Sequence, residues 1–485
     1  MRILKRSQLL HVLLIVCWLA AGSVAGSAEA AALATPASVQ AALKRAAIPV
    51  DSVGIHVQEV ASNQSLVSVN AEQAFNPAST MKLLTTGAAL ELMGPTATFS
   101  TTAYARGERD GDQLVGDLIL RGSGDPKLVV ENLWLFLRKI RAQGIRVIRG
   151  NLLLDRSAFA AAPASASGDP SQFDGDPLKP YNALPDALLL NFKALAVRFM
   201  PDTRRGTVSV TFDPQLDGYA VVGPRLGAEP CGADWRQNIA ATLDANTARF
   251  DGTFAAACGE KFWQIHPYQL SRNRYFELIF RQLWAGLGGS FEGKVIDGEV
   301  PPSAVLLAQW DSPALPELIR DINKFSNNVM ARQLFLALGS AGGNTPANVP
   351  QSRAVIARWL TSNGIDGSGL VLENGSGLSR IERISAATLG KVLVSAFRSP
   401  LMPEFIASLP LVGYDGTMKK RLRTQDVAGR AHIKSGSLQD VRTIAGYVLA
   451  ESGRRYAVVF LINHANAARG AEAQDALLQW VYRDN

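Results

Sequence analysis

The chain has 485 residues, of which 47% are hydrophobic and 19% are charged, and its formal net charge is +7. This composition excludes a chain that is disordered throughout, and the length is sufficient for two or more domains. No cluster of Lys and Arg interleaved with aromatic residues predicts nucleic-acid binding. The histidines and cysteines lack metal-ligand spacing, so we expect neither a metal nor a cofactor.

The N-terminal residues 1–30 have the pattern of a secretory signal peptide. Three basic residues precede an apolar run at 9–21, and small residues follow. The run is short for a membrane span, although an uncleaved anchor is the alternative. We interpret Cys17 as incidental, because the residue before it is too large for lipid attachment. Cleavage would lower the net charge to +5 by removing three basic residues and one acidic residue. We expect a periplasmic or otherwise exported protein with at most peripheral membrane association.

Next along the chain, hydrophobic periodicity predicts a helix at 36–48, two strands at 53–62 and 64–72, and a helix at 75–94. At the other end, residues 431–464 predict three strands, and residues 471–484 predict a closing amphipathic helix. Strands at both ends with helices between them indicate an α+β fold. Its core would be one antiparallel sheet built from both chain ends and flanked by helices.

The central part of the sequence has two characters. Residues 300–405 are rich in helical patterns, whereas residues 98–300 are rich in strands and turns and contain a loop-like tract at 160–182. We therefore expect a first domain formed by 31–97 and 301–485. Residues 98–300 would be inserted into it as two nested strand-rich domains, the inner one at roughly 125–200.

Two cysteines, Cys231 and Cys258, remain after signal cleavage. In an oxidising compartment such a pair usually forms a disulfide, which would stabilise the fold by roughly 3–4 kcal/mol in the chain-entropy model. Two unpaired buried thiols are the alternative.

Ser79 and Lys82 combine a hydroxyl and an amine at the start of the apolar helix. Residues three apart lie on one helix face, and burial of an ammonium favours the neutral amine. Such an amine could take the proton of the hydroxyl and make it a nucleophile. An N-capping serine and a lysine that reaches to solvent are the structural alternatives.

Two further short motifs occur later in the chain. Ser326-Asn327-Asn328 precedes a helical pattern, where N-capping is the ordinary role. Lys434-Ser435-Gly436-Ser437 lies on a predicted strand, where an ordinary polar edge is the alternative. Ser-x-x-Lys, a Ser-x-Asn triplet and a Lys-Thr-Gly-like triplet, in this order, form the signature set of penicillin-binding proteins and class A β-lactamases.

The sequence resembles the D-alanyl-D-alanine carboxypeptidase/endopeptidase family of class C low-molecular-mass penicillin-binding proteins, the penicillin-binding protein 4 type. The resemblance rests on "NPASTMK" around Ser79, "FSNNVMARQLF" around Ser326 and "ENGSGLSR" at 373–380. It also rests on the separation of 247 positions from Ser79 to Ser326, which leaves room for nested domains. The resemblance implies a serine transpeptidase-like fold with inserted domains.

The resemblance also implies a mechanism. Ser79 would attack the D-Ala-D-Ala bond or a D-amino-acid cross-link of a peptidoglycan stem peptide, and Lys82 would take the hydroxyl proton. Ser326 would pass a proton to the leaving amine, and Asn328 would orient Lys82. Water would release the acyl group, and β-lactams would act as inhibitors that stall at the acyl stage.

The remaining assignments concern substrate binding. Lys434 and Ser435 would hold the terminal carboxylate, and the N–H groups of Ser79 and Ser437 would form the oxyanion hole. Arg380 would recognise the side-chain end of the stem peptide.

Two positions depart from the family pattern, since Ser435 replaces a commoner threonine and Asn374 replaces an aspartate. A serine β-lactamase is one alternative, but no Glu-x-x-Leu-Asn run lies between Ser326 and Lys434. A non-catalytic cell-wall-binding scaffold with the same fold is the other.

Overall fold

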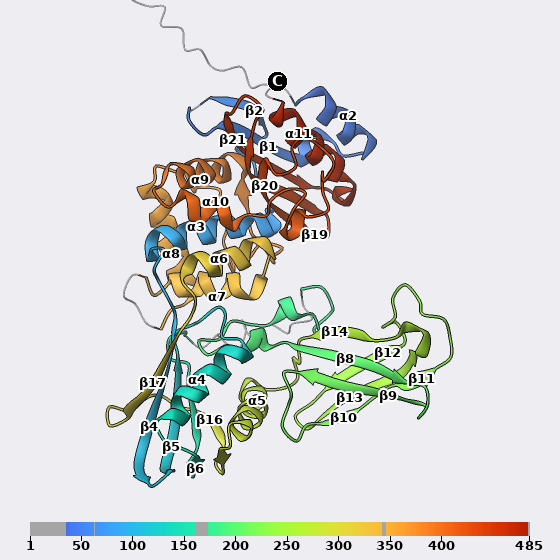
Figure 1. Cartoon of the computed structure of the whole chain (residues 1–485). Coiled ribbons are helices and arrows are strands. Elements are labelled where there is room, and N and C mark those ends of the chain that lie inside the picture. The colour runs from blue at the N-terminus through green and yellow to red at the C-terminus, as the bar shows by residue number, and fades with distance from the viewer. Residues whose placement is uncertain (1–34, 63, 161–172, 342–345, 484–485) are drawn as a thin grey trace, which may run out of the picture.

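A computed structural model describes residues 35–62, 64–160, 173–341 and 346–483. The expected signal peptide lies outside these ranges. None of the helices in the described ranges combines the length and the apolar character needed to cross a membrane. The chain forms an upper body and a lower inserted region, and the latter divides into a sheet lobe and an arm (Figure 1).

An antiparallel five-stranded sheet lies at the centre of the body. Its order is β19-β20-β21-β1-β2, so the first and last strands of the chain are neighbours, as the sequence predicts. The middle strands are buried on both faces, which is why they read as nearly continuous apolar runs. The strands are β1 (Val53–Glu59), β2 (Ser65–Val69), β19 (Ala431–Leu438), β20 (Val441–Leu449) and β21 (Arg455–Asn463).

Helices cover both faces of this sheet. Helices α2 (Ala37–Arg45) and α11 (Ala471–Tyr482) bury their apolar faces against one side, and α3 (Met81–Met93) and α9 (Ala386–Arg398) lie on the other. A second helical layer packs around α3; it consists of α6 (Leu315–Lys324), α7 (Asn328–Leu338), α8 (Val349–Ser362) and α10 (Met402–Ser408). The two-residue strands β3 (Ala74–Phe75) and β18 (Ile384–Ser385) pair beside them.

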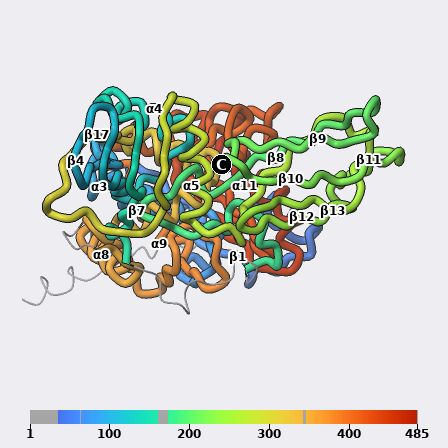
Figure 2. Tube along the Cα trace, turned by 90° about the horizontal axis from the view of Figure 1, so that it is seen from below, coloured from blue at the N-terminus to red at the C-terminus, as the bar shows by residue number. Residues whose placement is uncertain are grey.

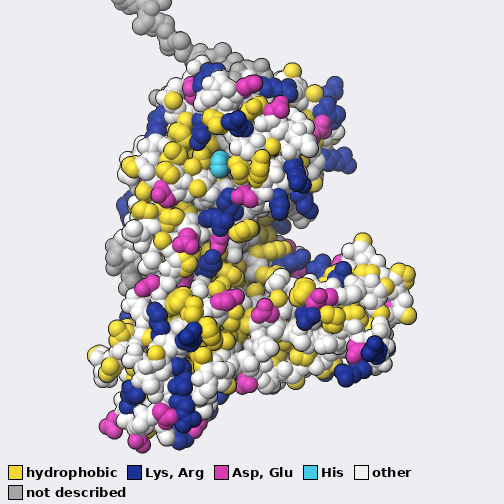
Figure 3. Space-filling model, viewed as in Figure 1, with side chains coloured by type: hydrophobic (Ala, Val, Ile, Leu, Met, Phe, Trp, Pro, Cys, Tyr) yellow, Lys and Arg dark blue, Asp and Glu magenta, His cyan; other side chains and the backbone are white. Residues whose placement is uncertain are grey.

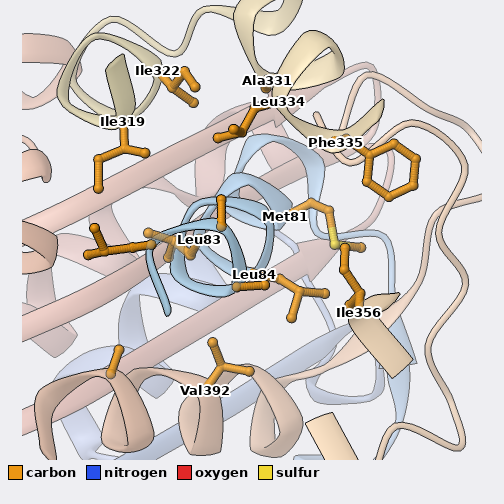
Figure 4. Close-up of a cluster of buried hydrophobic side chains, with 14 of the residues drawn as sticks. Met81, Leu83, Leu84, Ile319, Ile322, Ala331, Leu334, Phe335, Ile356 and Val392 are labelled. Atoms are coloured by element: carbon orange, nitrogen blue, oxygen red, sulfur yellow. The ribbon is translucent and has the colours of Figure 1, made fainter. Parts of the chain in front are cut away.

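Helix α3 has no solvent-facing stripe over its first ten residues, all of which are buried. Figure 4 shows its side chains, among them Met81 and Leu84, surrounded by residues of α6, α7, α8 and α9. A helix that is enclosed on every side is expected to be apolar all round. The one lysine in this stretch, Lys82, is therefore enclosed by protein rather than extended to water.

The sheet lobe of the inserted region contains a seven-stranded sheet with α4 (Val130–Ala142) and α5 (Arg272–Gly286) packed on it. Its main path is β15-β6-β5-β4-β17, and β7 and β16 pair with each other beside β5. The strands are β4 (Ser100–Asp110), β5 (Gln113–Gly122), β6 (Val147–Ile148), β7 (Leu152–Asp155), β15 (Ser290–Phe291), β16 (Val295–Asp297) and β17 (Val305–Asp311).

The arm consists of two smaller sheets, ordered β14-β8-β9 and β10-β13-β11 with β12 beside β13. Figure 2 shows the arm extending to one side of the sheet lobe. A disulfide joins Cys231 and Cys258 within it, with 4.8 Å between the Cα atoms. The strands are β8 (Leu195–Asp202), β9 (Thr207–Asp213), β10 (Ala220–Val222), β11 (Arg225–Gly227), β12 (Ile239–Leu243), β13 (Thr247–Ala255) and β14 (Lys261–Ile265).

The strand pairings group the segments of the insert differently from the expected boundaries. Residues 125–155, expected in the inner domain, supply α4, β6 and β7 to the larger sheet, and the separate inner sheets begin at β8 and end at β14. Strand β17, expected in the first domain, pairs with β4 of the insert. Parallel pairs such as β7–β16 join segments far apart in sequence, and local patterns do not reveal such partners.

Candidate active site

The first candidate residue, Ser79, lies in a single turn of 3-10 helix, Ala78–Thr80, directly before α3. The turn is tightly held, because Asn76 Oδ1 accepts from the Ala78 N–H and Thr80 Oγ1 donates to Pro77 O. Ala78 has φ +44°, in the left-handed region that non-glycine residues rarely occupy. Such strain is retained where the surrounding structure enforces it, and it often marks functional sites.

Lys82 is enclosed directly above Ser79 and has no exposed surface. Its Nζ atom lies 2.9 Å from Ser79 Oγ, 2.5 Å from Asn328 Oδ1 and 2.5 Å from the Ser376 carbonyl oxygen. Burial holds the pKa of Lys82 well below its usual value, and the nearby Lys434 lowers it further, against the opposing effect of Glu382. The site therefore favours the neutral amine.

The three partners of Lys82 differ in what they can do. The oxygens of Asn328 and Ser376 can only accept hydrogen bonds, whereas the Ser79 hydroxyl can also donate. A neutral amine has two N–H bonds and one lone pair. With both N–H bonds directed at the two acceptor oxygens, the lone pair faces Ser79 Oγ, as a base for that hydroxyl requires.

The second lysine, Lys434 on β19, is also fully buried. Its Nζ atom donates to Ser326 Oγ at 2.9 Å and to the Ser435 carbonyl oxygen at 2.6 Å. Burial lowers the pKa of Lys434 to about 7. Ser326, at φ +57°, lies in the short connection between α6 and α7, where Asn327 caps α7 by accepting from the Met330 N–H. This connection places Ser326 against Lys434 and Asn328 against Lys82.

Strand β19 is an edge of the central sheet, and the face of the sheet at Gly436 lies against the Ser79 turn. The Ile433 N–H donates to Pro410 O, away from β20. Because backbone direction alternates along an antiparallel strand, Ser435 and Ser437 also direct their N–H groups to this open edge. A Cβ atom on Gly436 would lie 2.7 Å from Ser79 N, so only glycine allows the strand to pass so close.

The remaining candidates lie around this cluster. The Ser435 hydroxyl donates to Thr417 Oγ1 at 2.7 Å, and Ser437 is exposed on the next outward position of β19. The exposed Arg380 guanidinium lies 4.7 Å from the centroid of the Phe173 ring. Within the described residues, no hydrogen bond joins its side chain to the serines and lysines above.

Glu382 is a buried residue that the sequence did not single out. Its carboxylate accepts the backbone N–H groups of residues 373, 374, 375 and 377, and so shapes the loop that presents the Ser376 carbonyl to Lys82. Burial raises its pKa, and the hydrogen bonds from the loop oppose that rise. A single glutamate within "SRIERI" has the appearance of a surface residue, so no sequence signal revealed it.

Asn374, where an aspartate was expected, belongs to the same loop. Its Oδ1 accepts from the N–H and hydroxyl of Ser376, and its Nδ2 donates to the Leu378 carbonyl. The amide thus forms its hydrogen bonds within the loop.

Comparisons with known proteins match nearly the whole described chain. Residues 35–483 match the model of the D-Ala-D-Ala carboxypeptidase 3 (S13) family. The chain is 28% identical over 420 residues to the D-alanyl-D-alanine carboxypeptidase DacB of Haemophilus influenzae, covering 85% of each chain. It is 30% identical over 447 residues to the D-alanyl-D-alanine carboxypeptidase of Actinomadura sp. (strain R39), covering 87% of this chain and 80% of the relative.

The fold has a solved counterpart as well. The crystal structure of penicillin binding protein 4 (dacB) from Haemophilus influenzae superimposes with a TM-score of 0.76 at 24% identity, over 92% of this chain and 99% of the other. That likeness covers the body and the inserted region together. By the extent of the family match, the chain belongs to the D-Ala-D-Ala carboxypeptidase 3 (S13) family.

Proposed function

We propose that the chain is an exported serine D,D-peptidase that hydrolyses D-Ala-D-Ala termini or D-amino-acid cross-links of peptidoglycan through a Ser79 acyl-enzyme. The observation that carries the proposal is the buried Lys82 amine, held between two obligate acceptors and the Ser79 hydroxyl. Membership of the family supports the same reaction.

In the acylation step, the Ser79 hydroxyl attacks the scissile carbonyl while its proton passes to the Lys82 lone pair. The carbonyl becomes a tetrahedral oxyanion, which the N–H groups of Ser79 and Ser437 stabilise from the turn and from the edge of β19. Loss of one such donor typically costs about 3–4 kcal/mol of transition-state stabilisation. Collapse of the intermediate breaks the bond to the leaving amine and forms an ester on Ser79.

The leaving amine needs a proton, and Ser326 is the group that delivers it. Its hydroxyl lies 2.9 Å from Lys434 Nζ, which can supply the proton that Ser326 gives up. Lys434 and Ser435 bind the substrate's terminal carboxylate, and Arg380 contacts the side-chain end of the stem peptide. The proton that Lys82 took from Ser79 replaces the one that Lys434 gave up, so that Lys82 is neutral again. It then acts as base for the water that hydrolyses the ester. A β-lactam, whose ring opens to form an ester on the same serine, acts as an inhibitor.

Export rests on the N-terminal residues 1–30, whose basic and apolar runs have signal-peptide character. We place the mature protein in the periplasm, with peripheral membrane contact at most. The Cys231–Cys258 disulfide suits an oxidising compartment.

The proposal is tested by labelling the purified mature protein with fluorescent penicillin, and by labelling its Ser79→Ala variant in parallel. We expect a covalent label on the wild type and none on the variant, and release of D-alanine from peptidoglycan peptides by the wild type alone. An unlabelled wild type would refute the proposal. Rapid turnover of nitrocefin would indicate a β-lactamase instead, and labelling without D-alanine release would indicate a scaffold.

A further inference from the structure

A strongly basic segment, residues 414–430, connects α10 to β19 beside the active site; we refer to it as the basic loop. It contains five basic residues against two acidic ones, a large share of the net charge of the chain. The basic residues are Lys419, Lys420, Arg421, Arg423 and Arg430, and the acidic ones are Asp415 and Asp426.

The base of the basic loop is firmly held against the catalytic elements. Asp415 forms an ion pair with Lys324, at the end of α6 just before Ser326. The Met418 side chain is fully buried in the core of the body. A Cβ atom on Gly416, at φ +54°, would lie 2.6 Å from the Lys324 carbonyl, so the backbones are in close contact. The backbone that carries the charges of the loop is therefore held close to the site.

Four of the five cations of the basic loop are exposed, and three of them, Lys419, Lys420 and Arg423, lie together near its middle. Arg421 is engaged by Asp475 of α11. Lys419, Lys420 and Arg423, by contrast, face solvent, and no carboxylate of the described residues forms an ion pair with them. Figure 3 shows Lys and Arg side chains gathered along the margin of the body on the side of β19 and α11, above the hollow that separates the body from the arm.

The basic loop is also joined directly to the carboxylate-binding end of the site. Thr417 accepts the hydroxyl proton of Ser435 in a 2.7 Å hydrogen bond. At the start of the loop, the Tyr414 ring is 63% exposed and offers a flat apolar face of the kind that packs against a sugar ring. Fixed cations and an exposed ring thus lie next to the place where the substrate peptide ends.

We propose that the basic loop is a docking surface for the peptidoglycan strand, which binds the carboxylates of stem peptides neighbouring the one being cleaved. The inference rests on the proposed function and extends it from a peptide to a polymer. A single short peptide places its terminal carboxylate at Lys434 and Ser435 and occupies that end of the site. A polymer presents further free carboxylates, so the loop raises affinity for polymeric substrate only, and raises it most at low ionic strength.

The test compares two triple variants of the full mature chain with the same change in net charge. In the loop variant, Lys419, Lys420 and Arg423 are each replaced by Glu. The control variant carries Lys44→Glu, Arg353→Glu and Arg358→Glu, at exposed positions on α2 and α8 that form no ion pair in the described part of the chain. A third variant with Gln at the three loop positions removes the charges without reversing them.

Binding is measured by co-sedimentation with insoluble peptidoglycan, with Ser79→Ala in every chain so that nothing is digested. We expect the loop variant to bind roughly tenfold more weakly than the control at low salt. The Gln variant should lie between them. The difference should vanish near 1 M salt, where the Debye length falls to about 3 Å. Penicillin acylation of the same variants with Ser79 intact should stay within about twofold of wild type, because the loop charges lie outside the acylation machinery.

Equal binding by the loop and control variants overturns the proposal, whether or not the wild type acylates. Binding loss confined to vesicles of anionic phospholipid, with peptidoglycan binding intact, overturns it in favour of a membrane surface. A loss of penicillin acylation as large as the loss of polymer binding would show that the charges act through the active site, and overturns it too. Failure of the wild type to acylate refutes the proposed function alone, because the sedimentation assay does not depend on turnover.

Discussion

The body and the inserted region bury their polar groups in different ways. In the body, Lys82, Lys434 and Glu382 are fully buried, and none forms an ion pair with another described residue. The insert buries one carboxyl without an ion pair in the described residues, Asp125, whose pKa burial raises to about 6. Its most buried ion pair, Arg156 with Asp186, joins two opposite charges in hydrogen-bond contact. An unpaired ionisable group in a core shifts its pKa and lowers the stability of the folded state, whereas a paired one keeps its charge.

This difference indicates which region is built for chemistry. The body keeps these unpaired buried groups, although they lower the stability of the folded state, because a neutral amine next to a hydroxyl can take its proton. The insert has an aromatic core around Phe199, Phe250 and Phe254 and carries many ion pairs at its surface, such as Arg198 with Glu260. We therefore expect substitutions in the body to change the rate of acylation, and substitutions in the insert to change stability.

The largest effect is expected from Lys82→Arg. A guanidinium keeps its proton at any pH relevant to proteins, so it cannot serve as the base for Ser79. Acylation by penicillin should slow by about 10³-fold or more, at the upper end of what a general base contributes. The second-order rate constant of labelling measures this loss, and circular dichroism shows whether the variant is folded. A folded variant that acylates at the wild-type rate would remove Lys82 from the role of base.

A smaller effect is expected from Glu382→Gln. The carboxylate of Glu382 has two oxygens that accept four backbone N–H groups, whereas the amide of glutamine has only one. The NH₂ group of the amide would face backbone N–H groups, donor against donor. The free energy of unfolding should fall by about 1–3 kcal/mol, and acylation should slow about 10- to 100-fold as the Ser376 carbonyl moves away from Lys82. Glu373→Gln is the matched control, because its side chain accepts none of these bonds. Equal effects of the two substitutions would contradict the positioning role of Glu382.

The pH dependence of acylation should separate the two lysines. Lys82 must be neutral to act, so the rate rises as the pH rises through its lowered pKa. Lys434 must be charged to hold a carboxylate, and its pKa in the free protein is about 7, so binding weakens as the pH rises above that value. The rate constant for acylation at low penicillin concentration should therefore follow a bell-shaped curve against pH. Its two apparent pKa values belong to the coupled pair of lysines and not to either lysine alone.

Lys434→Arg tests the alkaline side of this curve. The guanidinium keeps its charge, so the decline at high pH should disappear while the acidic limb keeps its midpoint. The acylation rate constant is measured from pH 5 to 10 for the wild type and for the Lys434→Arg variant. A decline that persists in the variant would assign it to a group other than Lys434.

The sequence predicts the structure best where a short motif lies at the start of a helix or on an edge strand. The turn before α3, the α6–α7 connection and the edge strand β19 could all be expected, because a helix start and an edge strand are local patterns. Glu382 and the Ser376 carbonyl could not, since a backbone oxygen has no residue signature and a buried glutamate looks like a surface one. The strand pairings of the insert could not be expected for a related reason, because β7 and β17 have partners distant in sequence.

The smallest effect on activity is expected from Cys231→Ser with Cys258→Ser. The pair closes a loop with a sequence separation of 27 within the arm, so its loss should lower the free energy of unfolding there by about 3–4 kcal/mol in the chain-entropy model. None of the hydrogen bonds of Lys82 or Lys434 involves the arm. Penicillin acylation of the double variant should therefore match wild type, while limited proteolysis should cut between β8 and β14 much faster. A matching fall in acylation would show that the arm stabilises the catalytic geometry, and that the two regions are less independent than their cores indicate.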